Sequence, residues 1–185
     1  NVASAAAGKL QQNQELADLV QALGCGTGAR YREDDLRYER VIIMTDADVD
    51  GAHIASLLLT FFYREMRGLI DGGHLYLAMP PLYRLSHGTK SIYARDDADR
   101  LRLIESEFKP GAKVEVSRFK GLGEMMPAQL KETTMKPGSR TLLRVELSET
   151  DGAATADLVE RLMGKKAELR FQFIQENAVF AKDVD

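Results

Sequence analysis

The sequence predicts an α/β fold with a parallel sheet, and three successive segments support this prediction. The apolar stretch Val41-Ile42-Ile43-Met44 is typical of a buried strand, and an acidic turn follows it at residues 45–51. An amphipathic helical pattern covers residues 54–70, and a second apolar strand is expected at residues 74–78. Strand, turn, helix and strand form a βαβ unit with parallel strands. We therefore expect the acidic turn at the carboxyl edge of a parallel sheet, where α/β proteins bind ligands.

The other elements follow in chain order from periodicity and turn residues. Leu10, Leu16, Leu19, Val20 and Leu23 recur at helical spacing, and Gly24 can end that helix in a left-handed cap. A loop at residues 24–37 is expected to lead to a strand at 41–45. Beyond the βαβ unit, we expect a hairpin of 83–85 with 91–94, a helix from Asp96 or Asp97 to about 107, strands at 114–119 and 141–147, and helices at 127–135, 154–163 and 167–180.

Composition sets outer limits on function. With 185 residues and 44% apolar content, the chain is long enough for one domain, or for one domain with an appendage. Its net charge of −3 provides no global basic field for nucleic acid. The single Cys25 cannot form an internal disulfide, and no signal peptide or membrane-spanning run is recognisable, so we expect a cytoplasmic protein. The chain starts at Asn1 rather than Met, which suits a fragment of a longer protein.

Three aspartates at alternate positions, Asp46, Asp48 and Asp50, form the most informative motif. On an extended strand end, side chains two residues apart point the same way. Carboxylates about 5 Å apart repel by about 3 kcal/mol per pair at an effective dielectric of about 20, so the cluster favours a bound cation. The ligands are oxygens, with His53 as the one nearby nitrogen donor, which favours Mg²⁺ over Ca²⁺ and Zn²⁺. The run therefore predicts a Mg²⁺ site for phosphate-ester chemistry.

Three other interpretations of this run fit the residues less well. An EF-hand loop needs a bidentate Glu at its twelfth position, which here is Leu57. A haloacid-dehalogenase-like phosphatase also places Asp-x-Asp after a strand, but it usually carries Thr or Val where this chain has Asp50. A solvated, noncatalytic acidic turn could use the aspartates only to cap the next helix, which needs one of them and not three. For the protein as a whole, a noncatalytic protein-binding module also stays open, and it would show neither Mg²⁺ dependence nor DNA-dependent behaviour. Phosphate release by the isolated chain would identify the phosphatase.

A second motif, Lys120-Gly121-Leu122-Gly123, lacks the glycine spacing of a dinucleotide fold and the Gly-Lys-Ser/Thr of a P-loop. Taken alone, it suits an ordinary tight turn. With Arg118 it offers two cations and backbone amides, which suit a phosphodiester chain, and its charge makes it an expected neighbour of the acidic turn. His53 is interpreted as an outer-sphere or phosphate contact, or as a structural hydrogen-bonding group.

Four motifs together resemble one family, the TOPRIM and tail region of bacterial type IIA DNA topoisomerase B subunits. The similarity covers nearly the whole chain, and Ile54-Ala55-Ser56-Leu57 is closer to the topoisomerase IV member of this family than to the gyrase member. The motifs are Thr45-Asp46-Ala47-Asp48-Val49-Asp50-Gly51-Ala52-His53-Ile54, Pro80-Pro81-Leu82-Tyr83, Arg118-Phe119-Lys120-Gly121-Leu122-Gly123-Glu124-Met125 and Gln175-Glu176-Asn177-Ala178. The resemblance implies a Rossmann-like TOPRIM domain in residues 1–110, without its N-terminal part, and a completing segment with a mixed, helical tail in residues 111–185.

The resemblance also implies the chemistry. Asp46 would contact both Mg²⁺ sites, Asp48 the second, and Asp50 would complete the cluster. Lys120 would contact DNA phosphate with support from Arg118, while Glu124 and His53 are possible supporting residues. The expected function is the Mg²⁺-binding part of a DNA cleavage-religation centre in an ATP-dependent topoisomerase. The nucleophilic tyrosine belongs to the A subunit, in an A2B2 heterotetramer associated with the bacterial chromosome.

The chain also departs from the family pattern. The Glu-Gly-Asp-Ser-Ala motif, whose glutamate is another metal ligand, does not occur in the sequence, and neither does the ATPase region. We therefore expect this polypeptide to be inactive in DNA cleavage on its own, as one part of a composite site.

Overall fold

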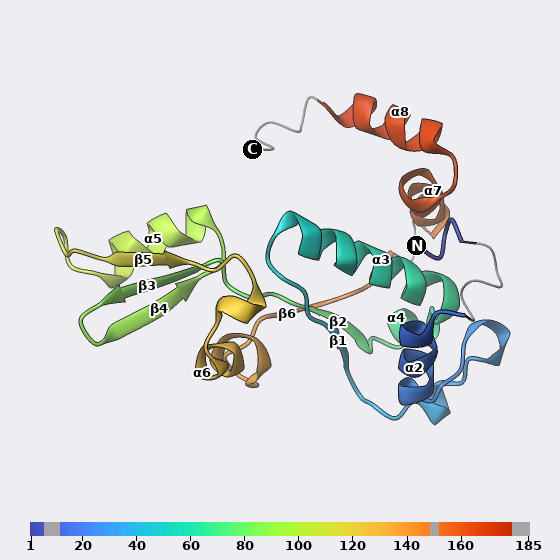
Figure 1. Ribbon diagram of the computed structural model, residues 1–185, viewed down its shortest axis with the longest axis horizontal. Helices are drawn as coiled ribbons and strands as arrows, with labels where there is room; N and C mark the ends of the chain where they lie inside the picture. The colour runs from blue at the N-terminus through green and yellow to red at the C-terminus, as the bar shows by residue number, and fades with distance from the viewer. Residues whose placement is uncertain (6–11, 149–151, 179–185) are drawn as a thin grey trace. The chain divides into compact units, whose positions relative to one another are not determined.

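The computed structural model describes residues 1–5, 12–148 and 152–178 (Figure 1). The chain divides into two compact units. The first comprises Asn1–Val41, Leu57–Leu75 and Val145–Asp185, and the second comprises Ile42–Ser56 and Tyr76–Arg144. Both sequence motifs that carry candidate chemistry, the acidic turn and the Lys120 loop, belong to the second unit.

Helix α2, Gln14–Leu23, begins the first unit and confirms the expected N-terminal helix. The side chain of Asn13 caps it by accepting a hydrogen bond from the N–H of Leu16 at 2.8 Å. Gly24 ends it with a φ of 79°, in the left-handed conformation that glycine adopts without strain. Leu10, which was part of the predicted pattern, lies outside the described residues. The expected loop contains two short 3₁₀ turns, η1 (Gly28–Arg30) and η2 (Glu33–Asp35).

The long central helix differs from its prediction at both ends. Helix α3 spans Val49–Glu65 and a separate short helix, α4, spans Gly68–Asp71, where one helix over residues 54–70 was expected. At the break, the ring of Tyr31 packs against Gly68, where an added Cβ would lie 2.1 Å from Tyr31 Cε1. The buried side chains of the first unit include Leu23, Phe61, Phe62, Met66, Leu69 and Leu75.

One three-stranded sheet contains β1 (Val41–Ile43), β2 (Leu75–Ala78) and β6 (Leu142–Arg144) in the order β1-β2-β6. The fold is of the expected α/β class, and the sheet contains the parallel strands of the βαβ unit. β6 is antiparallel to β2, with Ala78 opposite Leu142. β1 and β6 are both shorter than the strands predicted at 41–45 and 141–147.

A second, antiparallel sheet has the order β4-β3-β5, with β3 at Tyr83–His87, β4 at Lys90–Ala94 and β5 at Glu115–Arg118. The hairpin of β3 and β4 confirms the prediction, and Gly88 supplies the positive φ of its turn. Helix α5, Asp97–Glu107, lies along one face of this sheet (Figure 1). The Asp96 carboxylate caps it. Their shared core includes Tyr83, Leu85, Ala94 and Phe108.

The predicted helix at 127–135 is present in two parts. Helix α6, Pro127–Leu130, continues as a π-helical turn, η4, at Lys131–Met135. Pro127 at the first helical position needs no hydrogen-bond partner for its nitrogen, and the Gln129 side chain accepts from the N–H of Met126 at 2.9 Å.

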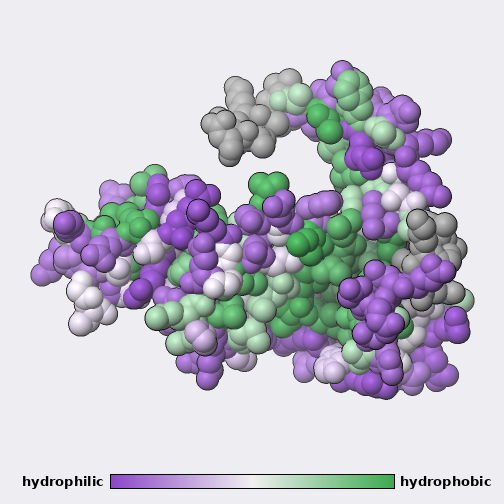
Figure 2. Space-filling view, viewed as in Figure 1, coloured by the Kyte–Doolittle hydropathy of each residue, from purple (hydrophilic) through white to green (hydrophobic). Residues whose placement is uncertain are grey.

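Two helices form the C-terminal tail, as expected: α7 at Gly152–Met163 and α8 at Ala167–Asn177. Arg161 pairs with Glu176 at 2.6 Å and links the two helices. Hydrophobic residues lie among hydrophilic ones on α8 (Figure 2), and Phe171 and Ile174 are exposed there. Phe180 lies outside the described residues. No helix within the described ranges has both the length and the apolar character needed to span a membrane.

Candidate functional site

The acidic turn connects β1 to α3, and its three aspartates occupy three different kinds of position. Asp46 lies in the turn, Asp48 precedes the helix, and Asp50 lies in its first turn, with all three exposed. The expectation that they project together from an extended strand end is therefore wrong. The reason is local, because an Asp side chain that binds a free backbone N–H starts the helix early.

Asp48 is that capping residue. Its Oδ1 accepts a hydrogen bond from the N–H of Gly51 at 2.7 Å, and its carbonyl oxygen accepts from the N–H of Ala52 at 3.0 Å. Asp50 follows in the first helical turn, where a negative charge is favourable near the positive end of the helix dipole. One aspartate thus serves as a cap, as the noncatalytic interpretation required, and the other two remain to be explained.

Asp46 packs between two glycines. A Cβ added to Gly51 would lie 2.0 Å from the carbonyl oxygen of Asp46, and a Cβ added to Gly121 would lie 3.0 Å from its Oδ2. The first distance is impossible and the second is tighter than ordinary packing allows. Gly51 needs to be glycine because the Asp46 backbone occupies the space of a methyl group, whereas a methyl group at Gly121 would require the Asp46 carboxylate or the loop to shift by a few tenths of an ångström.

A hydrogen bond joins Asp46 to the second motif. The N–H of Leu122 donates to Asp46 Oδ1 at 2.7 Å, across 76 residues of sequence. The expectation that the Lys120 loop lies beside the acidic turn is therefore confirmed. The contact is made by a backbone amide, whereas the sequence argument had relied on the charge of Lys120.

Two buried side chains hold the Lys120 loop at its ends. Phe119 is 8% exposed and Met125 is 7% exposed, whereas Lys120 and Glu124 between them are exposed. The N–H of Phe119 donates to the carbonyl of Leu82 at 2.8 Å, which ties the loop to the Pro80-Pro81-Leu82-Tyr83 motif. Residues of all three motifs meet around a gap too small to hold a water molecule: Ala47, Pro80, Pro81, Phe119, Gly121, Leu122 and Met125.

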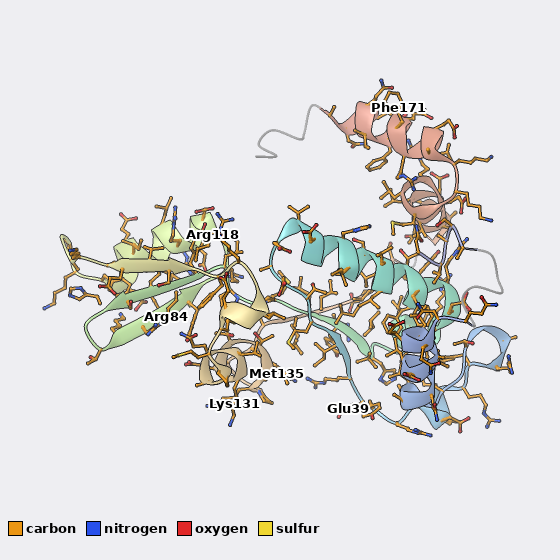
Figure 3. All side chains as sticks on the ribbon, in the orientation of Figure 1. Glu39, Arg84, Arg118, Lys131, Met135 and Phe171 are labelled. Carbon is orange, nitrogen blue, oxygen red and sulfur yellow. The ribbon has the colours of Figure 1, made fainter. Side chains whose placement is uncertain are left out.

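Two cationic residues, Arg118 and Lys120, lie just before this loop and at its start. Arg118 ends β5, directly before the loop (Figure 3), and pairs in register with Tyr83 of β3. Arg118 and Lys120 are both exposed. His53 is exposed on α3, one helical turn after Val49. Asp46, Arg118 and Lys120 thus lie on segments that the structure brings together, although the sequence separates them widely.

The residues of this site fit a hard divalent cation in their chemistry and only partly in their arrangement. All three aspartates offer carboxylate oxygens, which Mg²⁺ prefers. One oxygen each of Asp46 and Asp48 accepts a backbone N–H, and the second oxygen of each carboxylate keeps its lone pairs. Among the described residues, however, no three His, Cys, Asp or Glu side chains gather closely enough to form a metal cage. The described residues would therefore supply part of a ligand set.

Sequence reasoning missed two contacts here. It left the role of Glu124 open, yet Glu124 Oε2 accepts a hydrogen bond from the N–H of Lys120 at 2.7 Å. It also gave Gly121 no role toward Asp46. The first contact had a sequence signal, since an acidic side chain four residues after a loop residue can bind that residue's amide. The second had none.

Comparison with known proteins matches two regions of the chain. The Toprim domain profile matches residues 3–80, and the profile of the DNA gyrase B subunit carboxyl terminus matches residues 111–175. The B subunit of DNA topoisomerase 4 from Caulobacter vibrioides is 66% identical over 100% of this chain and 26% of its own length. The corresponding protein of Bartonella bacilliformis is 60% identical over 100% of this chain and 27% of its own length.

The chain belongs to the bacterial type IIA topoisomerase B-subunit family. The B subunit of DNA gyrase from Halalkalibacterium halodurans is 49% identical, over 100% of this chain and 29% of its own length. The greater similarity to the topoisomerase IV proteins confirms the preference drawn from Ile54-Ala55-Ser56-Leu57. This segment spans about a quarter of the length of the curated relatives, 26% and 27% for the two topoisomerase IV proteins.

The two matched regions carry one candidate motif each. The Toprim match contains the acidic turn, and the gyrase B match contains the Lys120 loop. The hydrogen bond between Asp46 and Leu122 therefore joins the two matched regions. The division into residues 1–110 and 111–185 stays a prediction.

Proposed function

We propose that this segment is the Mg²⁺-binding part of the DNA cleavage-religation centre of a type IIA topoisomerase, within the B subunit of a topoisomerase IV. The observation that carries the proposal is the hydrogen bond from Leu122 to Asp46, which fixes an acidic turn beside a loop that bears Lys120. A cation site next to an exposed ammonium group suits a phosphodiester, which is negatively charged and needs both kinds of contact.

Each residue has a distinct role in this proposal. Asp46 and Asp48 would hold the metal, each with the carboxylate oxygen that accepts no backbone N–H free for it, and Asp50 would complete or orient the cluster. Bound Mg²⁺ supplies positive charge that offsets the charge developing on the phosphoryl oxygens and on the leaving 3′ oxygen. Lys120 and Arg118 bind the DNA backbone next to the scissile phosphate; both are exposed, and the residue between them, Phe119, is buried.

Partners supply what the described ligand set lacks. A partner A subunit would contribute the tyrosine that attacks the phosphodiester, in an A2B2 assembly that hydrolyses ATP elsewhere in the B subunit. A further ligand from outside the described residues would complete the metal site. Action on chromosomal DNA places the assembly in the bacterial cytoplasm. The net charge of −3 means that DNA binding relies on local cations and not on the overall field.

The test replaces Asp48 by Ala in a complete topoisomerase IV B subunit that carries this segment, in complex with the A subunit. We expect Mg²⁺-dependent DNA cleavage to be abolished while ATP hydrolysis remains measurable. Retained ATP hydrolysis shows that the ATPase region of the B subunit is folded, and Asp48→Asn, which keeps an acceptor for the N–H of Gly51, controls for loss of the helix cap. Unchanged cleavage would remove Asp48 from the site.

A further inference from the structure

Glu124 lies on the loop of the candidate site, and the structure gives its carboxylate a definite contact. Oε2 accepts a hydrogen bond from the backbone N–H of Lys120 at 2.7 Å, which closes the five residues from Lys120 to Glu124 into a ring. An ionised carboxylate makes a shorter and stronger bond to an amide than a neutral acceptor does. The bond therefore fixes the backbone of the residue whose side chain carries the positive charge.

The rest of the loop backbone is bonded as well. The N–H of Leu122 binds Asp46, the N–H of Glu124 donates to the carbonyl of Gly121 at 3.2 Å, and the N–H of Met125 donates to the carbonyl of Leu122 at 3.2 Å. Without Glu124, the amide of Lys120 would lose its acceptor within the loop. The segment between the anchor Phe119 and the bonded Leu122 would then have one restraint fewer at Lys120.

The charge of Glu124 argues that it has a specific task. An exposed carboxylate four residues from Lys120 repels a DNA phosphate, which weakens binding at a site built for an anion. A neutral residue such as Gln would avoid that cost, but its amide oxygen would accept the Lys120 N–H less strongly than a carboxylate does. The carboxylate favours DNA binding overall if holding Lys120 in position stabilises the complex by more free energy than the repulsion costs.

We propose that Glu124 is a positioning residue that acts through Lys120: its carboxylate binds the Lys120 amide and thereby directs the Lys120 ammonium group toward the DNA phosphate. This inference rests on the proposed function, in which Lys120 contacts the DNA backbone. It differs from a role for Glu124 as a metal ligand or as a proton-transferring group, since both of those need the negative charge or the titratable proton, and positioning needs only an acceptor oxygen.

The first test measures hydrogen exchange of the Lys120 amide in the 185-residue chain, which requires no DNA. Glu124→Ala removes the acceptor, so we expect the Lys120 amide to exchange at least about tenfold faster. Glu124→Gln keeps an acceptor oxygen, so most of the protection is expected to remain. Equal exchange rates in the original chain and in Glu124→Ala would overturn the proposal.

The second test measures Mg²⁺-dependent DNA cleavage with the complete B subunit in complex with the A subunit. We expect Glu124→Ala to lower the cleavage rate about tenfold, because a displaced contact group costs this much or more, while Glu124→Gln stays within about threefold of the original rate. In a Lys120→Ala background, Glu124→Ala is expected to lower the cleavage rate almost no further, because the side chain that Glu124 positions is already absent.

Two results of the second test contradict the inference. If Glu124→Gln fails as completely as Glu124→Ala, the charge itself is required. If the losses from Lys120→Ala and Glu124→Ala multiply, Glu124 acts independently of Lys120. Failure of the proposed function is recognisable separately, since then the Lys120→Ala enzyme cleaves as well as the unmodified one, and the exchange measurement alone decides whether Glu124 holds the loop.

Discussion

The carboxylate of Asp46 accepts a hydrogen bond from the backbone amide of Leu122 at 2.7 Å, although 76 residues separate them in sequence. The bond makes the acidic turn and the Lys120 loop one structural unit. A change in the loop is therefore expected to displace an aspartate, and a change at the aspartate is expected to displace the loop.

Gly121→Ala tests the packing between the loop and Asp46. The new methyl group would lie 3.0 Å from Asp46 Oδ2 and would push the carboxylate or the loop aside. We expect DNA cleavage to fall about tenfold or more, since misplacement of a catalytic group has effects of this size. Gly123→Ala is the matched control, because nothing lies within 4 Å of the added Cβ. Its cleavage rate is expected within about twofold of the original, and equal losses in both variants would contradict a packing role for Gly121.

Asp48→Ala and Asp48→Asn separate the cap of helix α3 from the metal site. Ala removes the acceptor for the N–H of Gly51, which costs about 1 kcal/mol of unfolding free energy, whereas Asn keeps an acceptor oxygen and costs a few tenths. Denaturant unfolding measures both. In cleavage assays we expect the two variants to be equally defective, since both lack the charge that holds a cation. An active Asp48→Asn enzyme would limit Asp48 to the cap.

A histidine outside the candidate site predicts a pH dependence of stability. His74 Nδ1 lies 2.8 Å from the carbonyl oxygen of Glu39, and Nε2 lies 3.0 Å from Glu33 Oε1. The Glu39 carbonyl, followed by the Glu33 carboxylate, raises the pKa of His74 above its ordinary value of 6.5. Because the folded-state pKa is raised, this stabilisation is fully present below about pH 6.5 and is lost as the pH rises through the folded-state pKa.

The measurement is the midpoint of thermal unfolding at about pH 6 and about pH 8. The original chain should lose more stability over this interval than His74→Gln, which has no charge to lose. Glu33→Gln is expected to give an intermediate dependence, because the Glu39 carbonyl remains. If all three proteins show the same change, the charged form of His74 does not stabilise the fold.

Elements with strong local signals could be predicted from the sequence. The hairpin of β3 and β4 was found because Gly88 marks its turn, and helix α5 was found because Asp96 caps it. The start of α3 was missed because the apolar pattern begins at Ile54, whereas the first turn of the helix faces solvent. Val49 is 80% exposed there. Gly51 is the buried residue of this first turn, and because it has no side chain the turn offers no hydrophobic period to detect; only the cap by Asp48 indicates it.

The candidate site was predictable in its residue types and only partly in its geometry. Asp46 and Lys120 belong to recognisable motifs, and their opposite charges correctly suggested that the motifs meet. The contact itself depends on the packing of Gly121 against Asp46, which no pattern within either motif encodes. The predicted arrangement of the three aspartates was wrong because Asp48 caps helix α3, so the run does not continue as an extended strand with alternating side chains.

The most direct test of a metal role for the acidic turn is DNA cleavage with a complete B subunit carrying Asp46→Asn, in complex with the A subunit, over a range of Mg²⁺ concentrations. Asn keeps an oxygen that can accept the N–H of Leu122, so the loop stays in place, and only the negative charge is lost. We predict that cleavage falls at least about a hundredfold at every Mg²⁺ concentration. Cleavage at the original rate, with the original Mg²⁺ dependence, would show that Asp46 only holds the Lys120 loop and does not bind the metal.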